Sequence, residues 1–228
     1  RSYLGALATL RREHRSGDFV IGPGGAGVEG TWAYCLAVDE LREQLSEQQV
    51  PTLDAIIVAA GSGSTAAGLL AGILRTTGVA RRIIAVPVAS NPALRALVIG
   101  QAACALRWHD HSPRALGALR SLRIDPRFVG GGYGHPSRLG ERATELARSF
   151  GLELEPTYTA KAFAAALSWA SEIPAHNRRS KLRLHQRRTY LYWHTLSAVP
   201  LAPLLAGAPA KLPSELAQLL FEPLINPC

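Results

Sequence analysis

A loop of small residues lies between two apolar segments and has the groups needed to bind an anion. It consists of Gly61, Ser62, Gly63, Ser64 and Thr65. The apolar run before it, Ala55 to Ala60, is typical of a buried parallel strand, and the segment after it is typical of a helix. A helix N-terminus offers backbone N–H groups without partners, and the loop hydroxyls would join them. The pattern therefore predicts a binding site for a phosphate group.

Two other interpretations of this loop stay open. The spacing Gly61-x-Gly63-x-x-Ala66 also fits the dinucleotide fingerprint, which needs an acidic residue about 20 positions later to hold the ribose. The next expected strand ends at residues 88–91, Val-Ala-Ser-Asn, where no acid stands. The hydroxyls instead suit a terminal phosphate monoester, which has more acceptor oxygens to satisfy than a pyrophosphate. A glycine-rich turn without any ligand is the third interpretation.

The elements that must position this loop alternate along the chain. Strands are expected at residues 19–21, 55–60, 82–88, 127–129 and 189–194, and helices at 3–15, 31–47, 66–75, 91–106, 113–122, 138–150, 161–170 and after 212. Such alternation predicts an α/β fold, a mostly parallel twisted sheet with helices on both faces. No linker is evident, so residues 1–228 are expected to form a single α/β domain.

Loops rich in glycine or hydroxyl groups follow several of the expected strands. They are residues 22–27, 61–65, 130–134 and 195–197. Because the carboxyl ends of parallel strands meet at one edge of a sheet, we expect these loops to gather there. Ligands of open α/β sheets bind at that edge, so the order of loops along the chain predicts a binding site.

Composition and charge narrow the class of protein. The 228 residues are 47% hydrophobic and 18% charged, which is typical of a folded globular chain. No apolar run reaches the roughly 18 residues needed to cross a bilayer. The three cysteines are widely spaced, which indicates a reducing compartment, no disulfide framework and no metal site.

Much of the positive charge lies in one run. The net charge is +8, and residues 177–188 hold six Arg or Lys and no acid. A polyanion-binding patch and a solvated surface both fit this run. No aromatic residue is interleaved in it and no nucleic-acid motif accompanies it, so we expect no nucleic-acid partner.

Four segments, together with the strand near the C-terminus, carry a resemblance. They are IGPGGA at residues 21–26, the loop and helix at 60–72, VGGGYGHP at 129–136 and EPTYTAKA at 155–162, and YWHT at 192–195 is a weaker fifth. In this order they resemble the pyridoxal-phosphate enzymes of fold type II, whose fold is like that of the tryptophan synthase β subunit. They are most similar to the branch that holds D-cysteine desulfhydrase and 1-aminocyclopropane-1-carboxylate deaminase.

The resemblance implies a role for each matching residue. Gly61 to Thr65 would bind the phosphate of pyridoxal 5'-phosphate, and Thr195 would lie at the pyridine nitrogen. Tyr133 and Tyr158 would face the substrate and the cofactor ring, where they could stack, orient or transfer a proton. Packing of each tyrosine without a catalytic role stays open as well. Leu196 follows Thr195 where better-known members of the family have glycine.

The resemblance also implies an activity. It is that of an amino-acid lyase or deaminase that performs α,β-elimination and releases ammonia and a 2-oxo acid. Deaminases of this branch tend to carry an acid after the second tyrosine, whereas Thr159 stands here, which favours the desulfhydrase side. A small amino-acid substrate, a homodimer and a cytoplasmic location are expected, with no membrane partner and no metal.

The lysine required by this chemistry is missing from its expected place. The chain has only Lys161, Lys181 and Lys211, and Lys161 matches the family's second lysine instead of the Schiff-base residue. The family's Schiff-base lysine lies in a segment that would precede Arg1, and the chain contains no methionine. We therefore expect the C-terminal portion of a longer enzyme, without part of the small domain and inactive by itself. The alternative is a non-catalytic domain that binds a phosphate ligand.

Overall fold

The computed structural model describes residues 23–109, 115–171 and 188–196. The elements expected at 3–15, 19–21 and after 212 lie outside the described residues, as does nearly all of the basic run at 177–188. By its internal contacts the chain divides into two units, Arg1–Thr195 and Leu196–Cys228, and the fold described here belongs to the first. The single domain expected from the sequence stays a prediction.

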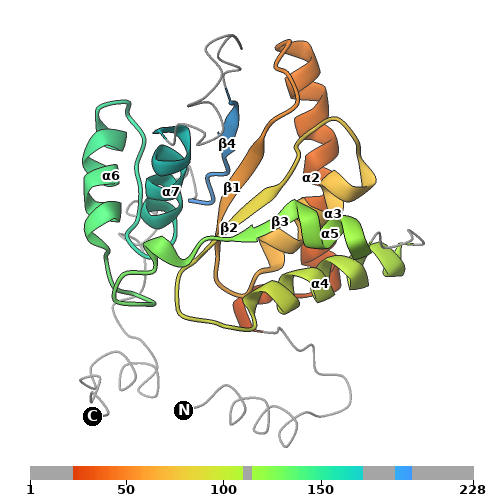
Figure 1. Cartoon of the computed structure of the whole chain (residues 1–228), viewed down its shortest axis with the longest axis horizontal. Helices are drawn as coiled ribbons and strands as arrows, with labels where there is room; N and C mark the ends of the chain where they lie inside the picture. The colour runs from red at the N-terminus through yellow and green to blue at the C-terminus, as the bar shows by residue number, and fades with distance from the viewer. Residues whose placement is uncertain (1–22, 110–114, 172–187, 197–228) are drawn as a thin grey trace, which may run out of the picture. The chain divides into compact units, whose positions relative to one another are not determined.

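A four-stranded parallel sheet forms the centre of this unit, with strand order β3-β2-β1-β4 (Figure 1). Its strands are β1 (Ala55–Ala60), β2 (Ile83–Pro87), β3 (Leu122–Ile124) and β4 (Tyr190–Tyr192). In the centre, Ile57 lies opposite Ile84 on one side and Tyr192 on the other. Every residue of β1 and β2 is buried, as expected for parallel strands covered on both faces.

Helices cover both faces of the sheet. One face carries α2 (Val28–Glu47), α3 (Ser64–Arg75), α4 (Leu94–Trp108) and α5 (Ala115–Ser121), and the other carries α6 (Arg138–Arg148) and α7 (Thr159–Ser171). Along β1, Ile56 and Val58 pack on the first face and Ile57 on the second, because side chains of a strand alternate. The predicted fold class, a mostly parallel sheet between helical layers, is confirmed.

Two glycines let α3 approach α2 closely. A Cβ atom added at Gly68 would collide with the carbonyl oxygen of Thr31, and one at Gly72 would collide with Val38. Only hydrogen fits at these two positions, which are one helical turn apart on α3. This close packing places the N-terminus of α3 against α2, directly after the loop at residues 61–63.

The expected strand at 127–129 is wrong, and the helix expected at 113–122 ends one residue early, at Ser121. Leu122 begins β3, and the 3-10 turn η2 (Pro126–Phe128) takes the place of the expected strand. Pro126 has no N–H to donate to a ladder, and the carboxylate of Asp125 accepts from the N–H of Arg127 and so begins the turn. The other expected elements within the described residues form within a few residues of their predicted bounds. None of the described helices is long and apolar enough to span a membrane.

Candidate functional site

The loop between β1 and α3 leaves backbone donors without partners among the described residues. Gly63 is the N-cap residue of α3, with φ of 90°, a left-handed conformation that favours glycine. No side chain caps the helix, and the first backbone bond of the helix runs from the N–H of Ala67 to the oxygen of Gly63, at 2.8 Å. The earlier amides of the first turn, Ser64 to Ala66, are therefore open to an acceptor such as phosphate.

The three hydroxyls of the loop have different environments. Ser64 is buried, and its hydroxyl lies 2.9 Å from that of Thr31 on α2. Ser62 and Thr65 are half-buried, and neither hydroxyl makes a hydrogen bond to any residue in the described part of the chain. Two of the three predicted hydroxyls thus remain open to a ligand, whereas Ser64 offers mainly its backbone N–H.

The two predicted tyrosines meet beside this loop. A Cβ atom at Gly61 would lie 3.1 Å from Cε1 of Tyr158, so the tyrosine ring rests on the glycine. The Tyr158 hydroxyl donates to that of Tyr133 at 3.3 Å, and the rings pack edge to face, 5.9 Å apart. Burial, the bond to Tyr133 and the charge of Glu155 raise the pKa of Tyr158 to about 12. The structure therefore brings Gly61, Tyr158 and Tyr133 together, and the roles of the two tyrosines toward substrate and cofactor stay predictions.

A second glycine loop also reaches the site. In the short turn η1 (Pro23–Gly25), a Cβ atom at Gly24 would lie 3.2 Å from the side chain of Ser62. The loop containing Gly24 thus lies against the one that follows β1. The expected gathering of glycine loops at one sheet edge is confirmed for the described parts of the loops at 22–27, 61–65 and 130–134.

Thr195 lies at the same sheet edge, three positions beyond the end of β4. Its strand is the neighbour of β1, and the pairing extends to the N–H of Trp193, which donates to the oxygen of Ile57 at 2.9 Å. Thr195 is exposed, and its hydroxyl makes no hydrogen bond within the described residues. The adjacent His194 is held by the hydroxyl of Tyr192, at 3.0 Å.

The carboxylate of Glu155 builds the segment that carries Tyr158. It accepts from the backbone N–H groups of Thr157, Tyr158 and Thr159 at 2.8, 2.6 and 2.7 Å. A carboxylate at the start of α7 also suits the positive end of the helix dipole. In the sequence, Glu155 stands out only as part of the motif EPTYTAKA. An acid followed by proline just before an apolar helix is nevertheless a signal for helix capping.

Lys161 is a residue whose role sequence reasoning missed. Its side chain is fully buried, and its amine donates to the oxygens of Val88, Val129 and Gly132 at 3.1, 2.8 and 2.7 Å. Burial lowers the pKa of Lys161, and the charge of Glu155 acts in the opposite direction. The ammonium thus joins the end of β2 to the loop that carries Tyr133, and its three donors are all engaged.

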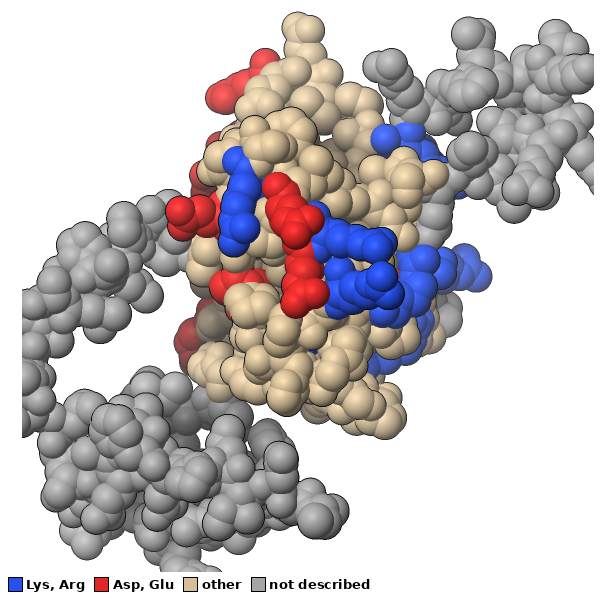
Figure 2. All heavy atoms as spheres, turned by 90° about the vertical axis from the view of Figure 1, so that its left-hand side faces the viewer, with Lys and Arg blue, Asp and Glu red and all other residues tan. Residues whose placement is uncertain are grey.

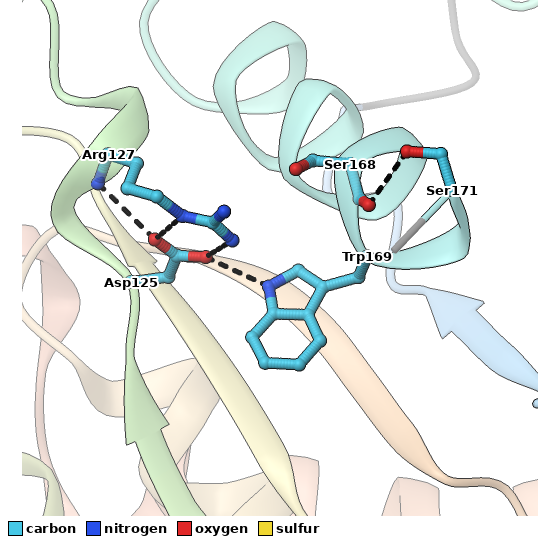
Figure 3. Close-up of polar contacts among 5 residues, drawn as sticks. All are labelled: Asp125, Arg127, Ser168, Trp169 and Ser171. Atoms are coloured by element: carbon cyan, nitrogen blue, oxygen red, sulfur yellow. Dashed lines mark hydrogen bonds and ion pairs between the residues drawn. The ribbon is translucent and has the colours of Figure 1, made fainter. Parts of the chain in front are cut away.

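A buried acid, Asp125, anchors the start of the segment that leads to the loop of Tyr133 (Figure 3). Asp125, which follows β3, accepts from the guanidinium of Arg127 at 2.7 and 2.9 Å and from the indole N–H of Trp169 at 2.8 Å. Burial alone would raise the pKa of Asp125, but these hydrogen bonds outweigh it and hold the pKa below its ordinary value. The contacts join the turn η2 to α7.

Comparison with known families agrees with this geometry. A sequence model of the family described as "Pyridoxal-phosphate dependent enzyme" matches residues 2–178. The chain belongs to this family. The loop after β1, the glycine loop of Tyr133 and the segment of Tyr158 all lie within the matched part.

Similar proteins narrow the comparison to one branch. D-cysteine desulfhydrases of Salmonella schwarzengrund and Salmonella paratyphi B are each 29% identical over 177 residues, which is 74% of this chain and 50% of theirs. A crystal structure described as an ACC deaminase homologue superposes with a TM-score of 0.55 and 24% identity, over 82% of this chain and 51% of that one. The chain therefore has the fold of these proteins and spans about half the length of the curated relatives it matches.

The residues around the loop fit the phosphate group of the family's cofactor. Open amides, two unengaged hydroxyls and the positive end of α3 converge, and Gly24, Gly61 and Gly63 keep side chains out of the way. The phenol of Tyr158 lies beside Gly61. In the described part of the chain no cluster of three or more His, Cys, Asp or Glu side chains could hold a metal.

Proposed function

We propose that the chain forms the cofactor-binding part of a pyridoxal-phosphate-dependent amino-acid lyase similar to D-cysteine desulfhydrase. The observation that carries the proposal is the contact of Tyr158 with Gly61 at the N-terminus of α3, with Tyr133 bonded to Tyr158. It joins an anion site to two phenols at the carboxyl edge of a parallel sheet, where ligands of such folds bind. Thr159, instead of an acid, follows Tyr158, which favours a desulfhydrase over a deaminase.

The overall reaction is an α,β-elimination. A β-substituted amino acid and one water give a 2-oxo acid, ammonia and the β-substituent, which is hydrogen sulfide for D-cysteine. Pyridoxal phosphate supplies the electron sink that stabilises negative charge at the substrate Cα.

The chain's own residues would bind the phosphate group and orient the cofactor. The amides of Ser64 and Thr65, with the hydroxyls of Ser62 and Thr65, hold the phosphate. The ring of Tyr158 forms a wall over Gly61. Since the pKa of Tyr158 is about 12, its phenol keeps its proton at neutral pH and acts as a hydrogen-bond donor. Thr195 would meet the pyridine nitrogen, where a hydroxyl does not enforce protonation. A homodimer and a cytoplasmic location remain predictions.

Binding of vitamin B6 compounds tests the phosphate site. Isothermal titration would compare pyridoxamine 5'-phosphate with pyridoxamine, neither of which needs a lysine to bind. We expect the phosphate ester to bind at least about tenfold more tightly, which corresponds to about 1.4 kcal/mol. The double variant Ser62→Ala, Thr65→Val should remove most of that difference, whereas Ser171→Ala, an exposed serine far along α7, should not. Equal affinity of wild-type protein for the two compounds would refute the phosphate site.

One observation favours the second candidate, a non-catalytic domain that binds a phosphate ligand. The amine of Lys161, the one lysine among the described residues, is engaged with three carbonyl oxygens and is not available as a nucleophile. Reduction with borohydride in the presence of pyridoxal phosphate, followed by peptide mass spectrometry, separates the candidates. When the reaction is run on the protein as its gene encodes it, with any segment before residue 1, a stoichiometric pyridoxyl label on a lysine of that segment supports the lyase. Tight binding without a stable label on any lysine of that protein supports the binding domain.

A further inference from the structure

A cavity lined by arginines lies beside the unpaired edge of the sheet. It has a volume of about 710 Å³ and is bounded by β3, the end of β2 and the start of α4. The guanidinium-bearing residues in its wall are Arg82, Arg95, Arg120 and Arg123, and its lining contains no acid. Its size lies in the range of cavities that hold small organic ligands. None of the residues of the phosphate loop or the tyrosine pair lines it.

Two of the four arginines are held in place by the protein. The guanidinium of Arg95 donates to the carbonyl oxygens of Leu122 and Leu119, at 2.9 and 2.6 Å. The guanidinium carbon of Arg123 lies 4.5 Å from the centre of the Trp169 ring, in a cation–π contact. Both positive charges are therefore oriented before any ligand arrives, which lowers the entropic cost of binding.

The other two arginines have no counter-charge within the described part of the chain. Arg82 and Arg120 are exposed, and neither forms an ion pair with an acid among the described residues. On the face drawn in Figure 2, most basic side chains gather on the right of the view, and the acidic ones lie in the middle and on the left. Like charges around one cavity repel each other, and a bound anion would relieve that repulsion.

We propose that this cavity binds an organic polyphosphate of nucleotide size. Guanidinium groups match phosphate oxygens in pairs, and four of them suit more than one phosphate. Pro87, Leu122 and Pro126 add apolar wall for an organic body, and Ser90 and Asn91 add polar groups. The competing explanation is that the arginines only keep the exposed edge of β3 from pairing with another chain. The two explanations differ in whether a soluble anion binds.

Titration calorimetry with ATP and adenosine tests the proposal. We expect ATP to bind and adenosine not to bind, with an ATP affinity that falls as salt rises because the contacts are ionic. The variant R82Q/R120Q should weaken ATP binding by about tenfold or more, as expected for two lost charge-assisted contacts. The variant R107Q/R142Q makes the same change of net charge on exposed residues outside the cavity and should leave the affinity within about twofold.

Three results would overturn the proposal. They are no binding of ATP, equal weakening by both double variants, and loss of ATP binding in Ser62→Ala, Thr65→Val, which would assign the anion to the loop after β1. Retention of ATP binding by that loop variant is expected. The cavity can therefore fail without affecting the proposed lyase, and the lyase can fail without affecting the cavity.

Discussion

Replacing Lys161 by methionine removes a buried positive charge while keeping a side chain of similar length. Three carbonyl oxygens, of Val88, Val129 and Gly132, then lose their shared donor. Two of them keep a weaker partner, because the N–H of Gly132 reaches Val129 and that of His135 reaches Gly132, at 3.2 and 3.4 Å. The link between the end of β2 and the glycine loop is lost, and with it the support beneath Tyr133.

The expected loss of stability in Lys161→Met is the balance of two effects, the lost hydrogen bonds and the avoided cost of burying a charge. Hydrogen bonds to a charged group contribute about 1.5–3 kcal/mol each, so three contribute about 4.5–9 kcal/mol. Keeping an ammonium out of water costs several kcal/mol, and methionine avoids that cost. The free energy of unfolding should therefore fall by about 2–4 kcal/mol, measured by urea denaturation with circular dichroism.

A local measurement shows whether Lys161 positions the tyrosines as well as stabilising the fold. The pKa of Tyr158 is raised to about 12, in part by its bond to Tyr133. Release of the loop should lower the pKa of Tyr158 in Lys161→Met toward its ordinary value, read from the absorbance of ionised tyrosine. Amides of residues 130–134 should also exchange faster with deuterium than those of β1, because opening is local.

Arg95→Met is the matched control for this prediction. Arg95 also donates to two backbone carbonyls near the sheet, those of Leu122 and Leu119, but it lies on α4, away from the tyrosines. It should lower stability without moving the titration of Tyr158. An unchanged Tyr158 titration and unchanged exchange at 130–134 in folded Lys161→Met would refute the positioning role, whatever the change in stability.

Three further variants or conditions test the packing and the charges. Gly68→Ala should destabilise the fold by about 1–3 kcal/mol or more, because the new methyl group forces α3 away from α2. Gly100→Ala on α4 is the control, since nothing lies within 4 Å of its new methyl group. In the same urea assay it should stabilise the fold by about 0.5–1 kcal/mol. Because folding raises the pKa of Tyr158 to about 12, its contribution to stability should be complete below pH 10 and should fall as pH rises toward 12. A stability that does not change between pH 10 and pH 12 would contradict this. Folding lowers the pKa of Asp125, so its contribution to stability should be present above pH 3.8 and lost as pH falls further. Asp125→Asn should lower the free energy of unfolding by about 1–3 kcal/mol at pH 7. In a pH series of melting curves, this variant should be less sensitive to acid than wild type.

The segment from β1 to α3 could be predicted from the sequence because its signals are local. An apolar run, a glycine turn and an alanine-rich helix fix each boundary, and β1 and the end of α3 fall where the pattern predicted. β3 could not be predicted in this way. Its first residue, Leu122, was expected to end a helix, and the short strand Leu122 to Ile124 is defined by its pairing with Ile83 to Ala85.

The contacts of the site were harder to predict than its loops. Tyr133 and Tyr158 were named by resemblance to a family, and their mutual hydrogen bond needs the fold. The part played by Lys161 depends on three carbonyl oxygens that are 29 to 73 positions away in sequence, which no local pattern records. Ser64 was expected to face the ligand with its hydroxyl, but a threonine 33 positions earlier engages it.

The glycines in and near the loop after β1 are required for three different physical reasons. A sequence motif alone does not reveal which reason applies to each glycine. Gly63 is needed for its left-handed backbone at the start of α3. Gly68 is needed because α2 passes too close for any side chain. Gly61 has no left-handed backbone, but a Cβ atom there would lie only 3.1 Å from the ring of Tyr158. A side chain at Gly61 would therefore have to shift the ring of Tyr158, so the first glycine of the motif and the second tyrosine constrain each other.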